Sequence, residues 1–464
     1  ILIIERIDEA QERELKSHQV RFVSLRAPIK NLIGSAPSGF DATQTRNYWR
    51  DLDKLVAEIE TSDSSDYVEY AGKGLTFAID DERMRVVTIK QSELNPKEKW
   101  GIYLRAPRTW FQALASREDW FSSMNQSKLY RLRRGLTTNA NTLYYLPSRN
   151  WRPHKDLEGR RQILSQSHGI LTLSNKVVRP LVKSPTRLQE FAVTATGPKS
   201  LIVYLQTPKD TTKDKDLLRY IEWMETEVAR EFSANDRFPS LARRMFAPEL
   251  KRRMTGVAES ERPARKRQEL KGIAAGFLRK EKVEIAPDWF TLPALEPAHF
   301  FCIPGINKRF AFFLNESGAV EDKRLYGLRV DTSRIPVEVY FAVLNCTLTY
   351  TAVELWGRTE LGLGVLDVVV NDYESMPILD VERVWAKLKA HPNLRKQLKE
   401  VATTMKTCKV LPIEKEIAQE TRHMLDELLL TKILGLPKAV VEKMRLDLWK
   451  MVESRLSRAR TISR

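Results

Sequence analysis

The side chains best suited to contact a nucleic acid lie close together between positions 131 and 141. They are three arginines, a glycine and four small polar residues: Arg131, Arg133, Arg134, Gly135, Thr137, Thr138, Asn139 and Asn141. Guanidinium groups bind phosphates and the guanine edge, and asparagine amides pair with the adenine edge. Glycine allows a backbone conformation that a side chain would resist, so the main chain can approach a ligand closely. The segment therefore suits a loop pressed against phosphates or base edges, although an ordinary hairpin with solvated arginines has the same composition.

Flanking elements must hold this segment in place. The basic cluster is expected at the end of a strand or helix, and the polar run from Thr137 to Asn141 favours a turn. Leu143–Leu146, which includes Tyr144, is a β-prone aromatic run. The sequence therefore predicts a strand or helix end, a polar turn and an aromatic strand, in that order.

Residues 134–145, RGLTTNANTLYY, resemble a family motif, R-G-x-x-T-G-x-N-x-x-F/Y-Y. In gamma-class adenine-N6 DNA methyltransferases this motif opens the target-recognition region. These enzymes belong to stand-alone and fused, Type IIG-like restriction–modification systems. The family has glycine where this chain has Asn139, and asparagine is the residue that best replaces glycine at a left-handed backbone position. The resemblance implies that the segment, Tyr144 included, contacts DNA.

Two further segments combine basic residues in a way that suits a phosphate backbone. The first interleaves them with an aromatic ring: Trp151, Arg152, His154, Lys155, Arg160 and Arg161. The second, residues 241–282, is the most basic part of the chain and includes Arg252 and Arg253. Such a region is either a solvated face or mobile loop, or an arm that neutralises phosphates without choosing a sequence.

Other segments follow in the order of the same family and resemble its strands, helices and loops: residues 99–107, 175–183, 201–205, 220–223, 288–292, 300–304, 308–315, 342–345, 356–366 and 376–380. Arg358 stands close to Gly362 and Gly364, so this basic loop either contacts a phosphate or forms a tight hairpin. Residues 41–59, 425–436 and 448–460 are predicted to form amphipathic helices that pack without further chemistry.

The residues that would carry out methyl transfer do not occur in this sequence. The family binds S-adenosylmethionine at a glycine-rich turn and holds the flipped adenine with an Asn/Asp-Pro-Pro-Tyr/Phe tetrapeptide, and we find neither. We also find no P-loop, and the six histidines have no metal-ligand spacing. We therefore predict no catalytic, cofactor or metal site in this chain. S-adenosylmethionine is implied only for the complete enzyme.

Composition points to a polyanionic partner. The 464 residues carry a formal net charge of +17, which favours association with nucleic acid. Cys302, Cys346 and Cys408 are widely spaced and odd in number, so a reducing cytoplasm is expected. The sequence has no apolar run long enough to span a bilayer.

We predict an α+β chain in three parts. Ile1–Ile4 and Val20–Leu25 are predicted to be strands. Residues 1–90 would be the end of a mixed α/β methyltransferase sheet, because Ile1–Leu25 resembles the closing strands of the family's catalytic domain. Residues 91–380 would be the target-recognition region with a basic insertion at 241–282, and residues 381–464 a helical tail. The chain would then be the C-terminal portion of a larger enzyme or one half of a split one.

The predicted function is DNA target recognition for a site-specific adenine-N6 methyltransferase, with this chain inactive alone. Its partners would be double-stranded DNA and a catalytic domain or subunit that carries the missing motifs. A stand-alone nucleic-acid-binding protein and a non-catalytic subunit of a defence complex remain as alternatives.

Overall fold

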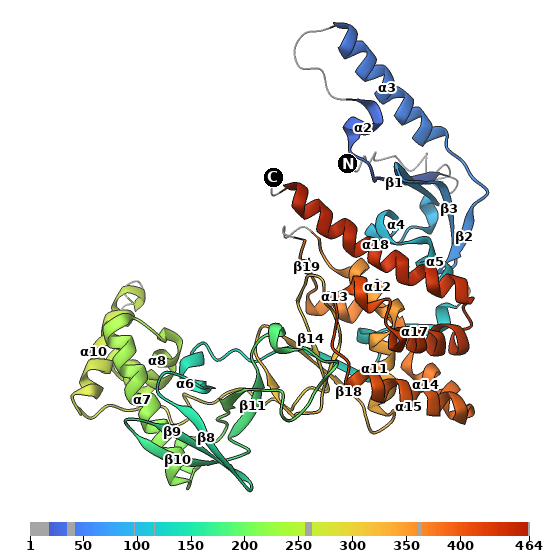
Figure 1. Ribbon diagram of the computed structural model, residues 1–464. Helices are drawn as coiled ribbons and strands as arrows, with labels where there is room; N and C mark the ends of the chain where they lie inside the picture. Colours follow the sequence, from blue (N-terminus) through green and yellow to red (C-terminus); the bar gives the residue numbers. More distant parts are fainter. Residues whose placement is uncertain are drawn as a thin grey trace. The chain divides into compact units, whose positions relative to one another are not determined.

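The computed structural model describes residues 18–34, 42–96, 98–115, 117–255, 262–359 and 364–462. The predicted strand at Ile1–Ile4 lies outside these residues. Helices alternate with several small sheets whose pairings are mostly antiparallel, which confirms the α+β class (Figure 1). Contacts divide the chain into two units, one formed by 1–131, 304–312 and 330–464, the other by 132–303 and 313–329. The functional assignment of the three predicted parts stays a prediction.

The first unit begins with a four-stranded sheet in the order β1-β4-β3-β2. Its strands are β1 (Gln19–Leu25), β2 (Tyr67–Tyr70), β3 (Lys73–Asp80) and β4 (Met84–Lys90). All three pairings are antiparallel, so these strands by themselves do not form a mixed sheet. The predicted amphipathic helix is present as α3 (Ala42–Thr61), and its Leu55 packs with Met84 and Val86. The short helix α2 (Ile29–Ile33) contributes Ile33 to the same core.

Helices form the remainder of the first unit. They are α4 (Gly101–Arg105), α5 (Arg108–Leu114), α11 (Val337–Asn345), α12 (Thr347–Trp356), α13 (Val370–Ser375), α14 (Val381–Ala390), α15 (Pro392–Lys406), α16 (Ile413–Glu416), α17 (Glu420–Asp426), the π-helical η7 (Glu427–Ile433) and α18 (Lys438–Ile462). Every residue of α12 is buried, as expected for a helix surrounded by others. Two short sheets accompany them, β5 (Phe121–Ser123) with β20 (Pro377–Leu379) and β15 (Gly305–Ile306) with β19 (Leu366–Asp367).

The second unit contains three sheets, ordered β10-β9-β8, β17-β11-β13-β7 and β12-β16-β14-β18-β6. Their strands are β6 (Tyr130–Arg134), β7 (Tyr145–Leu146), β8 (Arg152–Leu157), β9 (Arg160–Ser165), β10 (Gly169–Ser174), β11 (Val178–Val182), β12 (Ala192–Val193), β13 (Ser200–Val203), β14 (Phe300–Cys302), β16 (Phe313–Asn315), β17 (Val320–Glu321) and β18 (Tyr326–Val330). Its helices are α6 (Asn141–Tyr144), α7 (Lys215–Asn235), α8 (Pro239–Met245), α9 (Ala247–Arg253) and α10 (Arg262–Leu278).

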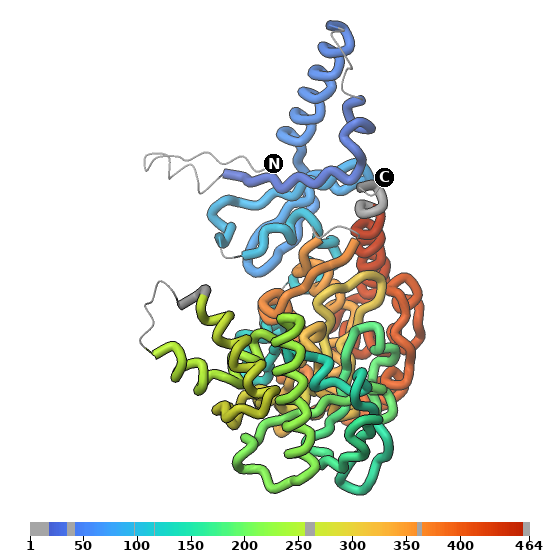
Figure 2. The backbone as a smooth tube through the Cα atoms, turned by 90° about the vertical axis from the view of Figure 1, so that its left-hand side faces the viewer, coloured from blue at the N-terminus to red at the C-terminus, as the bar shows by residue number. Residues whose placement is uncertain are grey.

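The basic region at 241–282 is mainly helical. Its described residues form most of α8 and all of α9 and α10, and α10 packs along α7 (Figures 1 and 2). Leu241, Leu250 and Ile273 from the three basic helices are buried in the core of the second unit. This part of the chain is therefore anchored by apolar burial over its described length, and its charges are carried on the outer helix faces.

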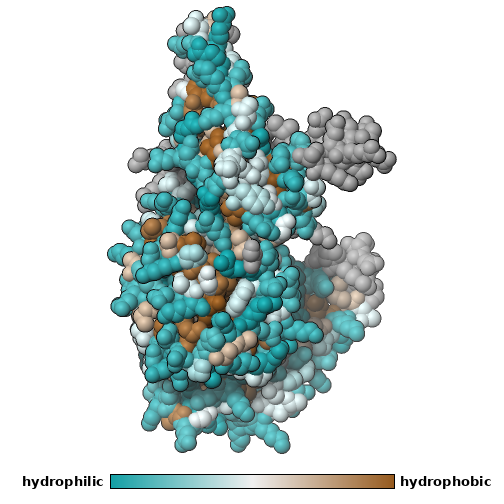
Figure 3. Space-filling model, turned by 90° about the vertical axis from the view of Figure 1, so that its right-hand side faces the viewer, coloured by the Kyte–Doolittle hydropathy of each residue, from teal (hydrophilic) through white to brown (hydrophobic). Residues whose placement is uncertain are grey.

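Hydrophilic side chains cover most of the face drawn in Figure 3, with hydrophobic ones interspersed. Within the described residues, no helix is both long enough and apolar enough to cross a membrane. Localisation in the cytoplasm stays a prediction.

A buried ion pair joins α18 to the rest of the first unit. Arg455 donates to Glu354 at 2.6 Å and to the carbonyl oxygens of Ile306, Asn307 and Gly364. Both charged side chains are less than a tenth exposed, at 3% and 7%. Because a buried carboxylate without its partner is costly, this pair should fix the docking of α18.

We therefore expect Arg455→Met to lower the free energy of unfolding of the first unit by about 3–5 kcal/mol, because Glu354 would keep a buried, unpaired charge. Urea unfolding followed by circular dichroism measures the change. The double variant Arg455→Met, Glu354→Gln serves as the control and should recover part of the loss. An unchanged unfolding midpoint in the single variant would contradict this account.

Candidate nucleic-acid interface

Strand β6 carries the predicted basic cluster. Arg131 and Arg134 are exposed, and neither has an acidic partner among the residues that the structure describes. Arg133 differs, because its Nε lies 3.4 Å from Oε1 of Glu321 and its Nη2 donates to the carbonyl oxygen of Glu296 at 2.5 Å. The structure thus separates two arginines that are available to a ligand from one that is held by the protein.

The carboxylate that holds Arg133 is deeply buried. Glu321 is 0% exposed, and no hydrogen-bond partner for its Oε2 occurs in the described part of the chain. Burial raises the pKa of Glu321, and the nearby Arg133 guanidinium partly opposes that rise. Because a buried carboxylate needs a cation beside it, Arg133 is a positioning residue for the neighbouring backbone.

The loop formed by residues 135–141, here termed the 135–141 loop, docks on a turn that is distant in sequence. The amide of Gly135 donates to the carbonyl oxygen of Leu325 at 2.9 Å, and that of Leu136 donates to Glu321 at 2.8 Å. Lys323 returns a bond to the carbonyl of Leu136 at 2.9 Å. Three main-chain hydrogen bonds therefore fix the start of the loop against the turn formed by residues 321–325, termed the 321–325 turn.

Gly135 is needed for space at this junction. A Cβ atom there would lie 2.3 Å from the carbonyl oxygen of Asp322, and its φ is not among those in the left-handed region. The expectation that Gly135 supplies unusual backbone freedom is therefore wrong. The close approach that it permits is to the backbone of the 321–325 turn.

Asn139 occupies the left-handed position that the sequence predicts, with φ of +56°. Its neighbour Thr138 is buried and donates from Oγ1 to Oδ1 of Asn141 at 2.5 Å, while also accepting from the amide of Ala140 at 3.2 Å. Asn141 is exposed, as is Thr137. The polar turn is confirmed, and it leaves the side chains of Thr137, Asn139 and Asn141 accessible.

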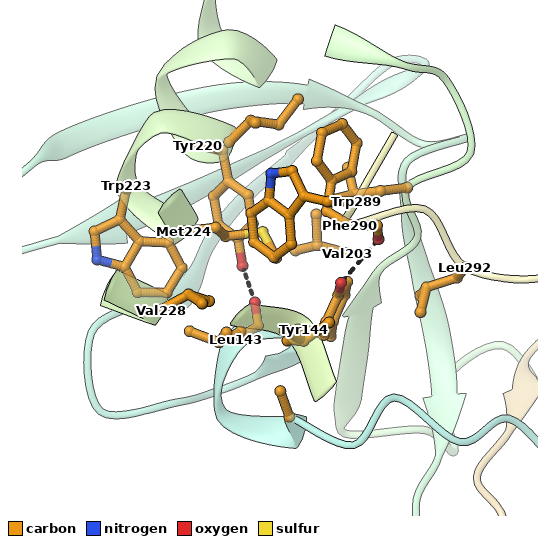
Figure 4. Close-up of a cluster of buried hydrophobic side chains, with 14 of the residues drawn as sticks. Leu143, Tyr144, Val203, Tyr220, Trp223, Met224, Val228, Trp289, Phe290 and Leu292 are labelled. Carbon is orange, nitrogen blue, oxygen red and sulfur yellow. Dashed lines mark hydrogen bonds between the residues drawn. The ribbon is translucent and has the colours of Figure 1, made fainter. Parts of the chain in front are cut away.

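The predicted aromatic strand is only half correct. Residues 141–144 form the short helix α6, and β7 begins at Tyr145. Tyr144 is 0% exposed and donates to the carbonyl oxygen of Phe290 at 2.8 Å (Figure 4). Burial raises the pKa of its hydroxyl. Tyr144 thus lies in the core rather than on a surface that DNA could contact, because its ring fills space between elements that the sequence alone does not bring together.

The fold brings three further cations to this region that sequence reasoning did not select. Lys183 lies 5.6 Å from the ring centroid of Tyr145, whose hydroxyl bonds to Asp322 at 2.7 Å. Lys323 and Arg324 are exposed on the 321–325 turn, and Arg324 is also bonded to Asp322 at 2.8 Å. Their sequence signal is weak because they come from separate segments, and only the docking of the loop places them nearby.

Strand β8 carries Arg152 and Lys155 at the edge of its sheet, and all of its residues are exposed. Pro153 and a register shift beside it discourage the addition of another strand. Trp151 is 1% exposed and packs against Tyr220, with ring centroids 5.5 Å apart. The predicted aromatic interleaving is therefore wrong in one respect, since Trp151 belongs to the core. The exposed edge strand carries Arg152 and Lys155 together with one acid, Asp156, which lies 3.3 Å from Arg161.

The remaining predicted arginines already have acidic neighbours. Arg252 and Arg253 both bond to Oε1 of the buried Glu249, at 2.5 and 2.8 Å. Arg358, in the first unit, lies 3.6 Å from Asp372, and its backbone pairs with that of Asp367. Part of the glycine loop that follows Arg358 lies outside the described residues.

No group of histidine, cysteine and acidic side chains suited to a metal ion occurs in the part of the chain that the structure describes. Cys302 and Cys346 are buried, and burial raises the pKa of each thiol. Neither cysteine is therefore a ready nucleophile.

One segment of the chain matches a known protein family. Residues 255–418 match the family model of the C-terminal domain of the Type II methyltransferase M.Eco57I. This segment is similar to a Type II methyltransferase. It covers less than half of the chain and includes α10, the 321–325 turn and Arg358, whereas the 135–141 loop precedes it.

No curated protein matches the chain. Among solved structures, the type IIG restriction endonuclease BpuSI aligns with 95% of this chain and 40% of its own, at 11% sequence identity and a TM-score of 0.49. The chain thus spans less than half the length of that enzyme.

The geometry at Gly135 leads to a stability prediction. We expect Gly135→Ala to destabilise the second unit by about 1–3 kcal/mol, the usual effect of forcing extra atoms into a packed site, because the new methyl group would collide with main-chain atoms. Thermal unfolding of both proteins measures the difference.

Gly272→Ala is the matched control. It adds the same methyl group inside α10, where nothing lies within 4 Å, and should stabilise the helix by about 0.5–1 kcal/mol. Equal behaviour of the two variants would show that the contact with Asp322 does not constrain the loop.

Proposed function

We propose that this chain is the target-recognition and DNA-binding part of a site-specific adenine-N6 DNA methyltransferase of the Type IIG-like, restriction–modification kind. The observation that carries the proposal is the match of residues 255–418 to a Type II methyltransferase C-terminal domain. The net charge of +17 and the exposed cations around the 135–141 loop support DNA as the partner.

In this proposal the 135–141 loop reads bases. Its main chain is held by hydrogen bonds to the 321–325 turn, so its exposed side chains start from a fixed position. The Asn141 amide would pair with the adenine edge in the major groove, and the Arg134 guanidinium would pair with guanine. Loop residues can make such contacts only if they reach the groove, and both side chains are exposed.

Cations around the loop would set its position on the duplex. Arg131, Lys183 and Lys323 come from three different segments and would each bind a phosphate. Arg152 and Lys155 on the exposed edge strand β8 would extend the contact along the backbone. Such contacts supply affinity and register, while the loop supplies the choice of sequence.

The chemistry would be carried out by a catalytic domain or subunit. In the complete enzyme, S-adenosylmethionine would donate the methyl group to an adenine that is rotated out of the duplex. This chain would hold the duplex while the base is extruded, and the cofactor would bind to the residues that carry the glycine-rich turn. The proposed location is the cytoplasm.

The proposal predicts that the purified chain binds duplex DNA in the absence of S-adenosylmethionine. Affinity should fall steeply as KCl rises from 50 to 200 mM, by roughly a thousandfold if about six phosphates are contacted, because each contact releases a counterion. Fluorescence anisotropy at several salt concentrations measures the slope of log affinity against log salt. Calorimetry tests whether the chain alone binds S-adenosylmethionine. Salt-independent DNA binding, or micromolar binding of S-adenosylmethionine by this chain alone, would overturn the proposed division of labour.

A second prediction concerns Asn141. After selection of a preferred site from a random duplex pool, Asn141→Ala should reduce discrimination at one base pair by about 1–3 kcal/mol, the usual value of a bidentate contact. Nonspecific affinity should change little, because no charge is lost. Competition binding with single-base variants of the selected site measures both quantities.

Asn139→Gly is the control for the shape of the turn. Glycine accepts the φ of +56° as readily as asparagine, so this variant should keep the loop conformation and the discrimination at the base pair assigned to Asn141. A loss of thermal stability in Asn141→Ala with unchanged discrimination would show that its bond with Thr138 only shapes the turn, and that base reading occurs elsewhere.

A further inference from the structure

Arg244 of α8 donates to the carbonyl oxygens of Asp288 and Thr291. The other described basic side chains of α8, α9 and α10 fall into two groups. The first group already has acidic partners within 4 Å, in the following pairs: Arg252 and Arg253 with Glu249, Arg253 and Arg265 with Glu269, and Arg267 and Lys271 with Asp236. The second group consists of Arg243, Lys251 and Lys266, which are exposed and have no acidic partner among the described residues. A cation without a carboxylate beside it keeps its full attraction for an external anion.

The three unpaired cations line a single hollow, here termed the α8–α10 hollow. Its volume is about 500 Å³, and its other lining residues are Ala247, Leu250, Met254 and Thr255. None of these described lining residues is acidic. The hollow therefore combines three positive charges with an apolar floor and one hydroxyl group.

Each cation comes from a different helix, Arg243 from α8, Lys251 from α9 and Lys266 from α10. The helices pack on one another and on α7 through the core of the second unit, in which Leu250 is 6% exposed. The spacing of the cations is thus set by packed helices rather than by side-chain flexibility alone.

We propose that the α8–α10 hollow binds the sugar–phosphate backbone of duplex DNA, outside the 135–141 loop. Each of Arg243, Lys251 and Lys266 would contact a different phosphate of the backbone, and the apolar edge of a deoxyribose would lie against Leu250 and Met254. This contact carries no base information, so it adds affinity for every sequence alike. The inference rests on the proposed function, since it names where that function holds the duplex.

The same geometry removes Arg252 and Arg253 from this role. The carboxylate of Glu249 accepts hydrogen bonds from both, which lowers its pKa, and the residue is only 2% exposed. Replacing these arginines would leave a buried charge unpaired and would reduce stability before it reduced DNA affinity. We therefore assign the phosphate contacts expected of Arg252 and Arg253 to Arg243, Lys251 and Lys266 instead.

The test compares two triple variants that each lose three positive charges from the same region. The first is Arg243→Gln, Lys251→Gln, Lys266→Gln, and the control is Arg265→Gln, Arg267→Gln, Lys271→Gln, whose side chains are paired. Anisotropy is measured on a duplex of random sequence over a range of KCl, after circular dichroism has confirmed the fold of each protein.

In the first variant, the slope of log affinity against log salt should decrease by about 2–3, because roughly 0.9 counterion is released per phosphate contact. The control should lose less than about one unit of slope. Equal slopes in the two variants, or no change in the first, would overturn the inference while leaving the proposed function intact. A wild-type chain that binds no duplex at all would overturn both.

A single position tests the hollow without removing a cation. Ala247 is exposed at the first residue of α9, where glutamate is well tolerated by the helix. Ala247→Glu places a carboxylate among the three cations and should weaken DNA binding on all sequences by at least about tenfold. Ala247→Gln, of nearly the same size, should weaken it less. Unchanged affinity in both variants would show that DNA does not occupy the hollow.

Discussion

The arrangement of the second unit depends on a contact between two stretches of main chain. The backbone at Gly135 approaches the backbone of Asp322 so closely that no Cβ atom fits between them. Hydrogen bonds from Gly135 and Leu136 to the 321–325 turn then fix the direction in which the chain leaves β6. The position of every side chain on the 135–141 loop follows from this junction, because a short loop with one fixed end has few remaining conformations.

Buried carboxylates decide which arginines remain available to a ligand. Glu321 holds Arg133, and Glu249 holds Arg252 and Arg253. A charge taken out of water must be compensated by a nearby opposite charge, so these arginines serve the fold first. Neighbours in the sequence that face no carboxylate keep an uncompensated charge at the surface. Basic residues are thus abundant along the chain, but those that remain available to bind an external anion lie at a few places on the surface.

Two kinds of contact with DNA follow from this distribution under the proposed function. The docked 135–141 loop offers amide and guanidinium groups of fixed position, which suit the recognition of base edges. Lys323 on the 321–325 turn, the cations of β8 and those of the α8–α10 hollow have no acidic partner in the described part of the chain, so they suit phosphates. A methyltransferase needs both, because a duplex must be held firmly while one base leaves the stack.

The sequence by itself determined the elements and their local chemistry. Period and composition predicted the strand at Val20–Leu25, the helix now seen as α3 and the polar turn with Asn139 in a left-handed conformation, because each depends on neighbours along the chain. The order of short motifs led to the resemblance to adenine-N6 DNA methyltransferases. The match of residues 255–418 to the C-terminal domain of a Type II methyltransferase agrees with the methyltransferase part of that resemblance. Local signals failed at Tyr144, where a β-prone run forms a helical turn inside the core.

Only the tertiary structure decided which side chains face solvent and which face a buried partner. Burial of Tyr144 and Trp151 depends on helices and strands that lie far away in sequence, and so does the pairing of Arg133 with Glu321. The meeting of Arg243, Lys251 and Lys266 at one hollow likewise requires three helices to pack together. A linear pattern cannot specify these contacts, because burial and charge pairing are set by residues that only folding brings within a few ångströms.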